Sequence, residues 1–135
     1  MRILRLRSAA LLLLLLAGLV AGCSGGPATQ RVEIRIHYSH YEPSVLTVTY
    51  GVPITFVLIN EDPIDHEWLL GDAAFHARHR TGTEKQHGAR PNEISVPALT
   101  TVETLLTFTA PGTLQYICHL PGHEAYGMVG TLTIT

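Results

Sequence analysis

Three potential metal ligands lie within eleven residues near the C-terminal end of the 135-residue chain. Cys118, His123 and Met128 offer a thiol, an imidazole and a thioether, and four residues separate each from the next. Soft sulfur combined with borderline imidazole nitrogen suits copper, which can change its oxidation state without leaving such a site. The residue types and their spacing therefore predict a copper site in this stretch.

One further nitrogen ligand would complete the set of two imidazoles, one thiolate and a weak axial Met that electron-transfer copper sites use. We expect His66 to be this ligand, because it follows a different candidate strand over residues 54–59. Each residue also has a simpler interpretation: a lone Cys is usually a buried hydrophobe, Met128 could fill the core, and both histidines could lie in surface loops. The occurrence of Cys118, His123 and Met128 together favours the metal site.

The first 22 residues have the order of a secretory signal. Three arginines precede an apolar run over residues 9–20, which is short for a membrane-spanning helix of ~20 apolar residues, and small residues follow. The segment Val20-Ala21-Gly22-Cys23 resembles the bacterial lipobox, in which the Cys is acylated and becomes the first mature residue. We therefore expect a lipoprotein signal over 1–22 and a lipid anchor on Cys23; an ordinary signal peptide that ends near a Cys is the alternative.

The chain has two cysteines, and in an exported protein a disulfide between Cys23 and Cys118 is the ordinary expectation. If Cys23 carries lipid, this disulfide is excluded, and Cys118 remains a free thiol in an oxidising compartment. A bound metal would protect such a thiol from oxidation, which again points to Cys118 as a ligand.

The chain that follows the leader is acidic. The sequence has nine basic and eleven acidic residues, and the leader contains three of the basic ones, which leaves a formal charge near −5 with His neutral. This charge argues against nucleic acid as a partner. The remaining 113 residues suit one domain with a single core, so we expect a flexible tether over 23–30 and one monomeric domain over 31–135.

Short strand patterns separated by turn residues fill most of this domain. Apolar residues alternate with charged ones over 31–36, which is typical of a strand with one solvent-exposed face. Further strand-like runs follow as far as 129–135. Seven or eight short strands predict an all-β, antiparallel Greek-key sandwich. Residues 71–91 lack strand periodicity, and we expect them to form an insertion with a short helix over Ala73–Arg80. Because such a sandwich gathers its loops at two ends, His66 can meet the Cys118 thiol although 51 residues lie between them.

The C-terminal third, LQYICHLPGHEAYGMVGTLTI, resembles the copper motif of the cupredoxins, the plastocyanin/azurin-like type 1 blue-copper proteins, and its spacing resembles that of the rusticyanin-like members. The resemblance extends more weakly over 31–135. It implies one type 1 copper ion with His66, Cys118 and His123 as equatorial ligands and Met128 as the axial ligand. Many cupredoxins place Asn or Ser directly after the first His, whereas Glu67 stands here, with a side chain that we expect to point to solvent.

Further histidines accompany these ligands. His76 and His79 would share one face of the short helix and His87 follows, so that these three could form a second, labile copper or zinc site, a docking surface or only a solvated loop. His119, beside Cys118, raises an enzymatic alternative, because a His beside the copper Cys ligates a second copper in multicopper oxidases and copper nitrite reductases. Those reactions need several more His ligands and a further domain, so we expect no enzymatic activity and a His119 that faces away from the metal.

The resemblance, together with the leader, implies a lipid-anchored one-electron carrier in the bacterial cell envelope that faces the periplasm or the extracellular side. Its redox partner would be a respiratory complex, a cytochrome or an oxidase. The alternative is a copper chaperone or resistance protein that binds copper and passes it on.

Overall fold

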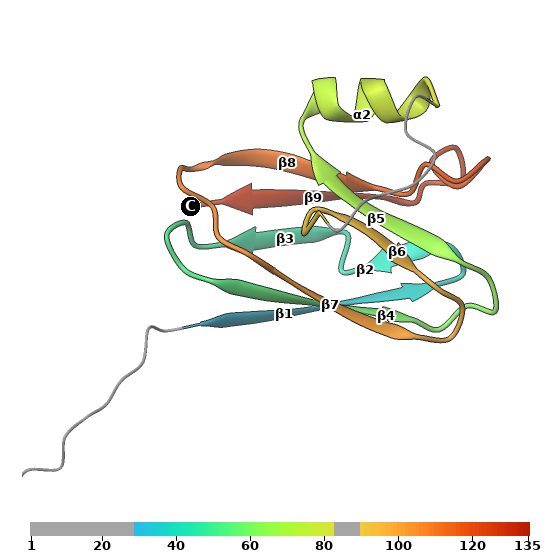
Figure 1. Ribbon diagram of the computed structural model, residues 1–135, viewed down its shortest axis with the longest axis horizontal. Coiled ribbons are helices and arrows are strands. Elements are labelled where there is room, and N and C mark those ends of the chain that lie inside the picture. The colour runs from blue at the N-terminus through green and yellow to red at the C-terminus, as the bar shows by residue number, and fades with distance from the viewer. Residues whose placement is uncertain (1–28, 83–89) are drawn as a thin grey trace, which may run out of the picture.

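The computed structural model of the chain describes residues 29–82 and 90–135. Within these ranges the chain forms nine β-strands in two sheets and one short helix, α2 (Ala73–Arg80) (Figure 1). The strands are β1 (Gln30–His37), β2 (His40–Glu42), β3 (Val45–Val48), β4 (Ile54–Asn60), β5 (His66–Gly71), β6 (Glu93–Val96), β7 (Thr101–Leu106), β8 (Gly112–Ile117) and β9 (Val129–Ile134). The predicted leader, the acylation of Cys23 and any role of His87 fall outside the described residues.

The two sheets form the predicted sandwich. The first has the strand order β2-β1-β4-β7 and the second the order β3-β9-β8-β5-β6. Most neighbouring strands are antiparallel, but β1 pairs with β4 and β3 pairs with β9 in parallel, so that both sheets are mixed rather than purely antiparallel. This difference arises because the chain crosses to the second sheet at β3 and returns to the first at β4, in the direction of β1.

The core lies between the sheets and follows from the alternation along the strands. On β1, Val32, Ile34 and Ile36 are buried, whereas the charged residues between them are exposed. Burial of each such side chain contributes roughly 1.5–3 kcal/mol. Across the interface of the two sheets, the ring of Phe56 on β4 packs against the ring of Trp68 on β5, with centroids 5.1 Å apart. The core thus joins both sheets into the rigid support on which the connecting loops are held.

A close contact between two strands fixes the second sheet. Tyr116 on β8 lies opposite Gly130 on β9 in the antiparallel register, and a Cβ atom at Gly130 would lie 2.0 Å from the Tyr116 ring. The Tyr116 hydroxyl donates a hydrogen bond of 2.7 Å to the backbone oxygen of Pro43. Glycine is required at position 130 because the ring crosses the neighbouring strand at this point.

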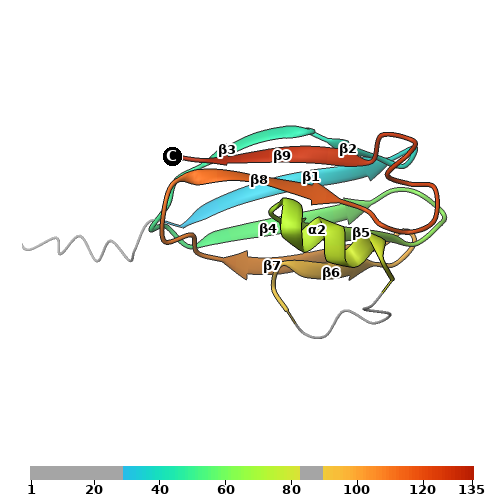
Figure 2. The same cartoon turned by 90° about the horizontal axis from the view of Figure 1, so that it is seen from above.

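The β4–β5 loop and the β8–β9 loop lie at the same end of the sandwich in both views (Figures 1 and 2). The first of these loops leads into His66, which begins β5, and the second begins with Cys118, directly after β8. The sandwich therefore brings together two segments that are far apart in the sequence.

Helix α2 lies on the outer side of the second sheet, next to β5 and β8 (Figures 1 and 2). It spans the residues that the sequence predicted. The carboxylate of Asp72 accepts a hydrogen bond of 2.8 Å from the Phe75 N–H and caps the first turn. Within the described part of the chain, no helix is long and apolar enough to cross a membrane.

Candidate metal centre

Three side chains converge at the loop end of the sandwich. His66, Cys118 and His123 each offer one ligand atom, and these three atoms all lie within 4.8 Å of one another. The two Nδ1 atoms are 3.2 Å apart, and Cys118 Sγ lies 3.3 Å from His123 Nδ1. Such separations fit neighbouring ligands of one ion, since metal–nitrogen and metal–sulfur bonds are about 2.0 and 2.3 Å long. Among the described residues this is the one group of three or more His, Cys, Asp or Glu side chains with that geometry.

Met128 lies at the far end of the same loop, directly before β9. Its side chain is fully buried and belongs to the same core cluster as Cys118. The Met128 backbone accepts a hydrogen bond of 3.3 Å from the Cys118 N–H and donates one of 3.0 Å to the His123 oxygen. These bonds tie the three C-terminal candidate ligands to one another through the backbone.

The loop that carries these ligands is a compact series of turns. The N–H groups of His123 and Tyr126 donate to the oxygens of Leu120 and Gly122, each over 3.0 Å. Gly122 and Gly127 adopt φ angles of +87° and +96°, which residues with a Cβ rarely adopt. The loop is therefore closed by its own hydrogen bonds, which fix the backbone that carries His123.

His66 is fixed by a buried carboxylate that sequence analysis missed. Asp62 Oδ2 lies 2.8 Å from His66 Nε2, and the Asp62 carboxylate also accepts hydrogen bonds of 2.8 Å from the N–H groups of Tyr38 and Ser39. Burial disfavours the charged form of Asp62, but the hydrogen bonds from Ser39, Tyr38 and His66 outweigh it and lower the pKa of this carboxyl. An ionised carboxylate only accepts, so Nε2 of His66 carries the hydrogen and Nδ1 presents its lone pair to the cluster.

Cys118 is held as a neutral thiol until a metal displaces its proton. Burial raises the pKa of Cys118 to about 11, although backbone N–H groups of Glu67 and Leu120 favour the thiolate. The Glu67 N–H lies 3.4 Å from Sγ, so the backbone of Glu67, the residue that departs from the family pattern, contacts the sulfur. The Glu67 side chain is half-buried rather than fully in solvent.

His123 is half-buried and is flanked by exposed loop residues, Pro121, Gly122 and Ala125. Burial lowers the pKa of His123, and the neighbouring His66 lowers it further. A neutral imidazole is the form that binds metal. The donor set of one sulfur and two imidazole nitrogens, with the buried thioether of Met128 in the same core cluster as Cys118, fits copper.

Of the three histidines considered for a second metal site, the structure describes His76 and His79. His76 on α2 lies 2.9 Å from His119, measured from Nδ1 to Nε2, while His79 contacts the Phe75 oxygen through its Nδ1. His119 faces α2, as expected for a residue that follows the ligand Cys along the chain. Sequence analysis placed His76 and His79 on one face, but it missed His119 as the partner of His76.

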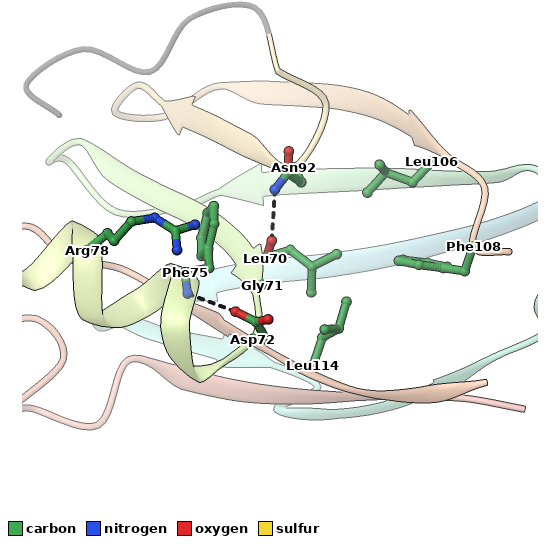
Figure 3. A pocket seen from close by; sticks show the side chains of 9 residues that line it. All are labelled: Leu70, Gly71, Asp72, Phe75, Arg78, Asn92, Leu106, Phe108 and Leu114. Carbon is green, nitrogen blue, oxygen red and sulfur yellow. Dashed lines mark hydrogen bonds between the residues drawn. The ribbon is translucent and has the colours of Figure 1, made fainter. Parts of the chain in front are cut away.

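A pocket of about 400 Å³ lies beside the start of α2 (Figure 3). Apolar side chains such as Leu106, Phe108 and Leu114 form much of its lining. The Asn92 amide donates to the Leu70 oxygen over 3.0 Å, and Asp72 caps α2 (Figure 3). The polar side chains of Asn92 and Asp72 thus hold β5 and the helix start in place.

Comparison with known proteins places the chain in a family. Residues 28–135 match the family described as copper binding proteins, plastocyanin/azurin family. A relative from Pseudomonas aeruginosa, named copper-resistant cuproprotein CopI, is 30% identical over 139 residues that cover 79% of this chain and 77% of the relative. A protein of the same name from Rubrivivax gelatinosus is 30% identical over 119 residues that cover 84% and 72%.

Solved structures agree with this assignment. Auracyanin B, a protein of Chloroflexus aurantiacus, matches the fold with a TM-score of 0.67 at 26% identity, over 82% of this chain and 91% of the auracyanin chain. His66, Cys118, His123 and Met128 are positioned like the ligands of a type 1 copper ion. The chain therefore belongs to the plastocyanin/azurin family of copper-binding proteins, the cupredoxins.

Proposed function

We propose that this protein is a one-electron carrier. The observation that carries the proposal is the ready-made cluster of His66, Cys118 and His123, whose ligand atoms are already within 4.8 Å of one another. Copper bound there would supply reversible one-electron chemistry between Cu(I) and Cu(II). Fixed ligands support this role because a site that keeps one geometry in both oxidation states loses little energy to rearrangement.

Each ligand has its own support in the fold. Asp62 orients His66, the Glu67 N–H and the Met128 oxygen hold the segment at Cys118, and the turn at Leu120 holds His123. His66 and Cys118 are almost completely shielded from solvent, with 1% and 0% of their surface exposed. The half-buried His123 is then the ring through which an electron would enter or leave.

The exposed surface around His123 suits a brief encounter with a redox partner. Pro121, Gly122, Ala125 and Tyr126 are exposed, and Tyr126 is 75% exposed. Redox encounters use small interfaces, often below ~1,200 Å² in total, which permits fast release. We infer a protein partner such as a respiratory complex, a cytochrome or an oxidase, and a monomeric carrier that acts without nucleic acid.

The N-terminal sequence supports a place at the outer face of a bacterial membrane. The leader has the order of a lipoprotein signal, and Cys23 stands at the position that the lipobox acylates. Lipid chains on Cys23 would confine diffusion to the membrane surface, because more than one chain gives stable anchoring. Mass spectrometry of the protein from bacterial membranes tests this part of the proposal through the acyl mass on Cys23.

Loading of the metal-free protein with one equivalent of Cu(II) tests the carrier function. The expected result is an intense visible thiolate-to-copper band that disappears on reduction, returns on oxidation and survives many such cycles. A weak colour, or loss of the copper during cycling, would overturn the proposal.

A second candidate function is copper resistance, in which the protein binds copper and transfers it. Two relatives are named copper-resistant cuproproteins, and this name favours the candidate. Competition with a chelator distinguishes the two functions. A carrier retains both Cu(I) and Cu(II), whereas a transfer protein releases Cu(I) to an acceptor within the time of a single encounter.

A further inference from the structure

Two buried imidazoles face each other outside the metal centre described above. His76 on α2 is fully buried, and the His119 side chain is 7% exposed. Nδ1 of His76 and Nε2 of His119 are 2.9 Å apart. The hydrogen bonds on the outer sides of the two rings determine what lies between them.

The outer nitrogen of His76 must carry a hydrogen. Nε2 of this ring lies 3.1 Å from the backbone oxygen of Gln115, and a carbonyl oxygen only accepts hydrogen bonds. A neutral His76 is therefore protonated on Nε2, and its Nδ1 presents a lone pair to His119.

The outer nitrogen of His119 is held in the same way. Nδ1 of His119 lies 3.2 Å from Oε2 of Glu124. Nε of Arg80 donates to both Glu124 oxygens, over 3.0 and 2.9 Å, which keeps this group a carboxylate that can only accept. A neutral His119 is therefore protonated on Nδ1, and its Nε2 presents a lone pair to His76.

Two neutral rings in these tautomers would place two lone pairs against each other at 2.9 Å, so a cation is needed between them. A proton is one solution, but burial lowers the pKa of His76 and opposes it. A metal ion is the other solution. With bonds of about 2.0–2.1 Å, a nitrogen separation of 2.9 Å corresponds to an angle of about 90° at the metal, the angle between neighbouring ligands of a tetragonal ion such as Cu(II).

We propose that His76 and His119 bind a second metal ion, which is Cu(II) when copper is present. Copper is the expected ion because it binds nitrogen sites more tightly than the other divalent first-row metals. A surface depression of about 500 Å³ is lined by His119, Glu124 and the loop at Pro121, so that solvent approaches the site from the side of His119. With two protein ligands, this ion is held less tightly than the copper of the first centre.

His79 has a supporting place in this arrangement. Its ring stacks on His119 with centroids 6.0 Å apart and planes 14° from parallel, while its Nδ1 contacts the Phe75 oxygen at 2.9 Å. The stacking orients His119 toward His76. Of the histidines predicted for a second site in the insertion, His76 is thus assigned as a ligand, and His119 takes the place of His79.

The test uses the full chain with its first centre already loaded with one copper. A second equivalent of Cu(II) is added, and the electron paramagnetic resonance spectrum is recorded. The expected result is a tetragonal signal with coupling to two nitrogens, while the visible band of the first centre stays unchanged. Failure to bind a second equivalent would leave a shared proton as the cation between the rings and would overturn the proposal.

Variants locate the second ion. His76→Gln and His119→Gln should each weaken binding of the second equivalent at least about tenfold, whereas the control His37→Gln, at a side chain that is 41% exposed, should not change it. The visible band of the first centre reports whether each variant is folded. Undiminished binding in both variants would exclude these rings as ligands.

A nitrogen NMR measurement tests the proposal without the visible band of the first centre. In the metal-free protein, Zn(II) titration should shift Nδ1 of His76 and Nε2 of His119 as the second site fills, while the outer nitrogens keep their hydrogens. Shifts confined to His66 and His123 would overturn the second site and leave the proposed carrier intact. A second site that fills in a protein without the visible band would overturn only the carrier.

Discussion

Asp62 lies 2.8 Å from Nε2 of His66, four residues away, and thereby directs the other nitrogen of that ring toward Cys118. This contact links the metal centre to the segment between β1 and β2, because the same carboxylate accepts hydrogen bonds from the N–H groups of Tyr38 and Ser39. The carboxylate places a negative charge one ring away from the metal, where it favours Cu(II) over Cu(I).

Replacement of Asp62 by Asn tests this contact. The amide keeps the size of the side chain and removes the charge, so we expect Cu(II) affinity to fall about tenfold, equivalent to a rise in reduction potential of about 60 mV if Cu(I) binding is unaffected. Redox titration measures the shift. Asp65→Asn is the matched control, since Asp65 contacts the Ala98 N–H in the same loop; an equal shift in both variants would contradict a specific role of Asp62.

Replacement of Cys118 by Ser should abolish the visible band and leave the fold intact. The hydroxyl fits the space of the buried thiol, and the sandwich core does not depend on a thiolate. Absorption and circular dichroism spectra of the copper-loaded variant measure the two effects separately. An unchanged absorption spectrum would refute the assignment of Cys118 as the sulfur ligand.

Replacement of Met128 by Gln should keep the band but lower the reduction potential, because a harder axial oxygen favours Cu(II). Voltammetry of the copper-loaded protein measures the shift. In the control Met128→Leu, the sulfur is removed without a new oxygen, and we expect no such decrease. A potential that is the same in all three proteins would mean that Met128 is not a ligand.

Copper uptake should release about one proton from the thiol, because the pKa of Cys118 in the metal-free protein is raised by burial to about 11. Between pH 7 and 9 the affinity should therefore rise about tenfold per pH unit. Calorimetry in two buffers with different ionisation enthalpies counts the released proton. Uptake without proton release would show that the thiolate is already present.

The same shift predicts how the stability of the metal-free protein depends on pH. The pKa of this thiol is higher in the folded chain than its ordinary value of 9.0, so the folded state binds the proton more tightly than the unfolded state. The free energy of unfolding should then stay constant below pH 9 and decrease as the pH rises toward 11. The decrease should be smaller in Cys118→Ser, where only the buried Tyr41 and Tyr116, whose pKa values are also raised by burial, still contribute above pH 10. Denaturant titrations at several pH values measure it.

Replacement of Gly130 by Ala should destabilise the sandwich by about 1–3 kcal/mol, because the new methyl group overlaps the Tyr116 ring. Gly112→Ala is the matched control in the neighbouring strand β8, where an added Cβ meets nothing within 4 Å. Thermal unfolding of both variants gives the comparison. Equal stability of the two variants would mean that the Tyr116 ring moves aside with little loss of folding free energy.

Much of the fold could be predicted because it is encoded locally. The alternation of apolar and charged residues marks β1, and the loss of that alternation, followed by helix-compatible residues, gave α2 the bounds that the structure has. The parallel pairing of β1 with β4 could not be predicted in this way. Strand direction depends on when the chain changes sheets, which no local pattern records.

The candidate metal centre also has one part that the local sequence predicts and another that depends on the whole fold. The spacing of Cys118, His123 and Met128 lies in a single loop and is visible in the sequence, whereas the approach of His66 followed only from the sandwich as a whole. Asp62 was missed because its role depends on the N–H groups of the β1–β2 turn. An acidic residue four positions before a candidate ligand was the one available signal.

Cys118 and His119 are consecutive residues that directly follow β8, yet their side chains reach different neighbours. The sulfur belongs to the sandwich core with Met128, while the imidazole meets the outer helix at His76. A single peptide unit thus connects the interior of the sandwich to the helix on its outer face. A displacement of α2 that moves His119 would therefore act on the residue next to the sulfur ligand of the first centre.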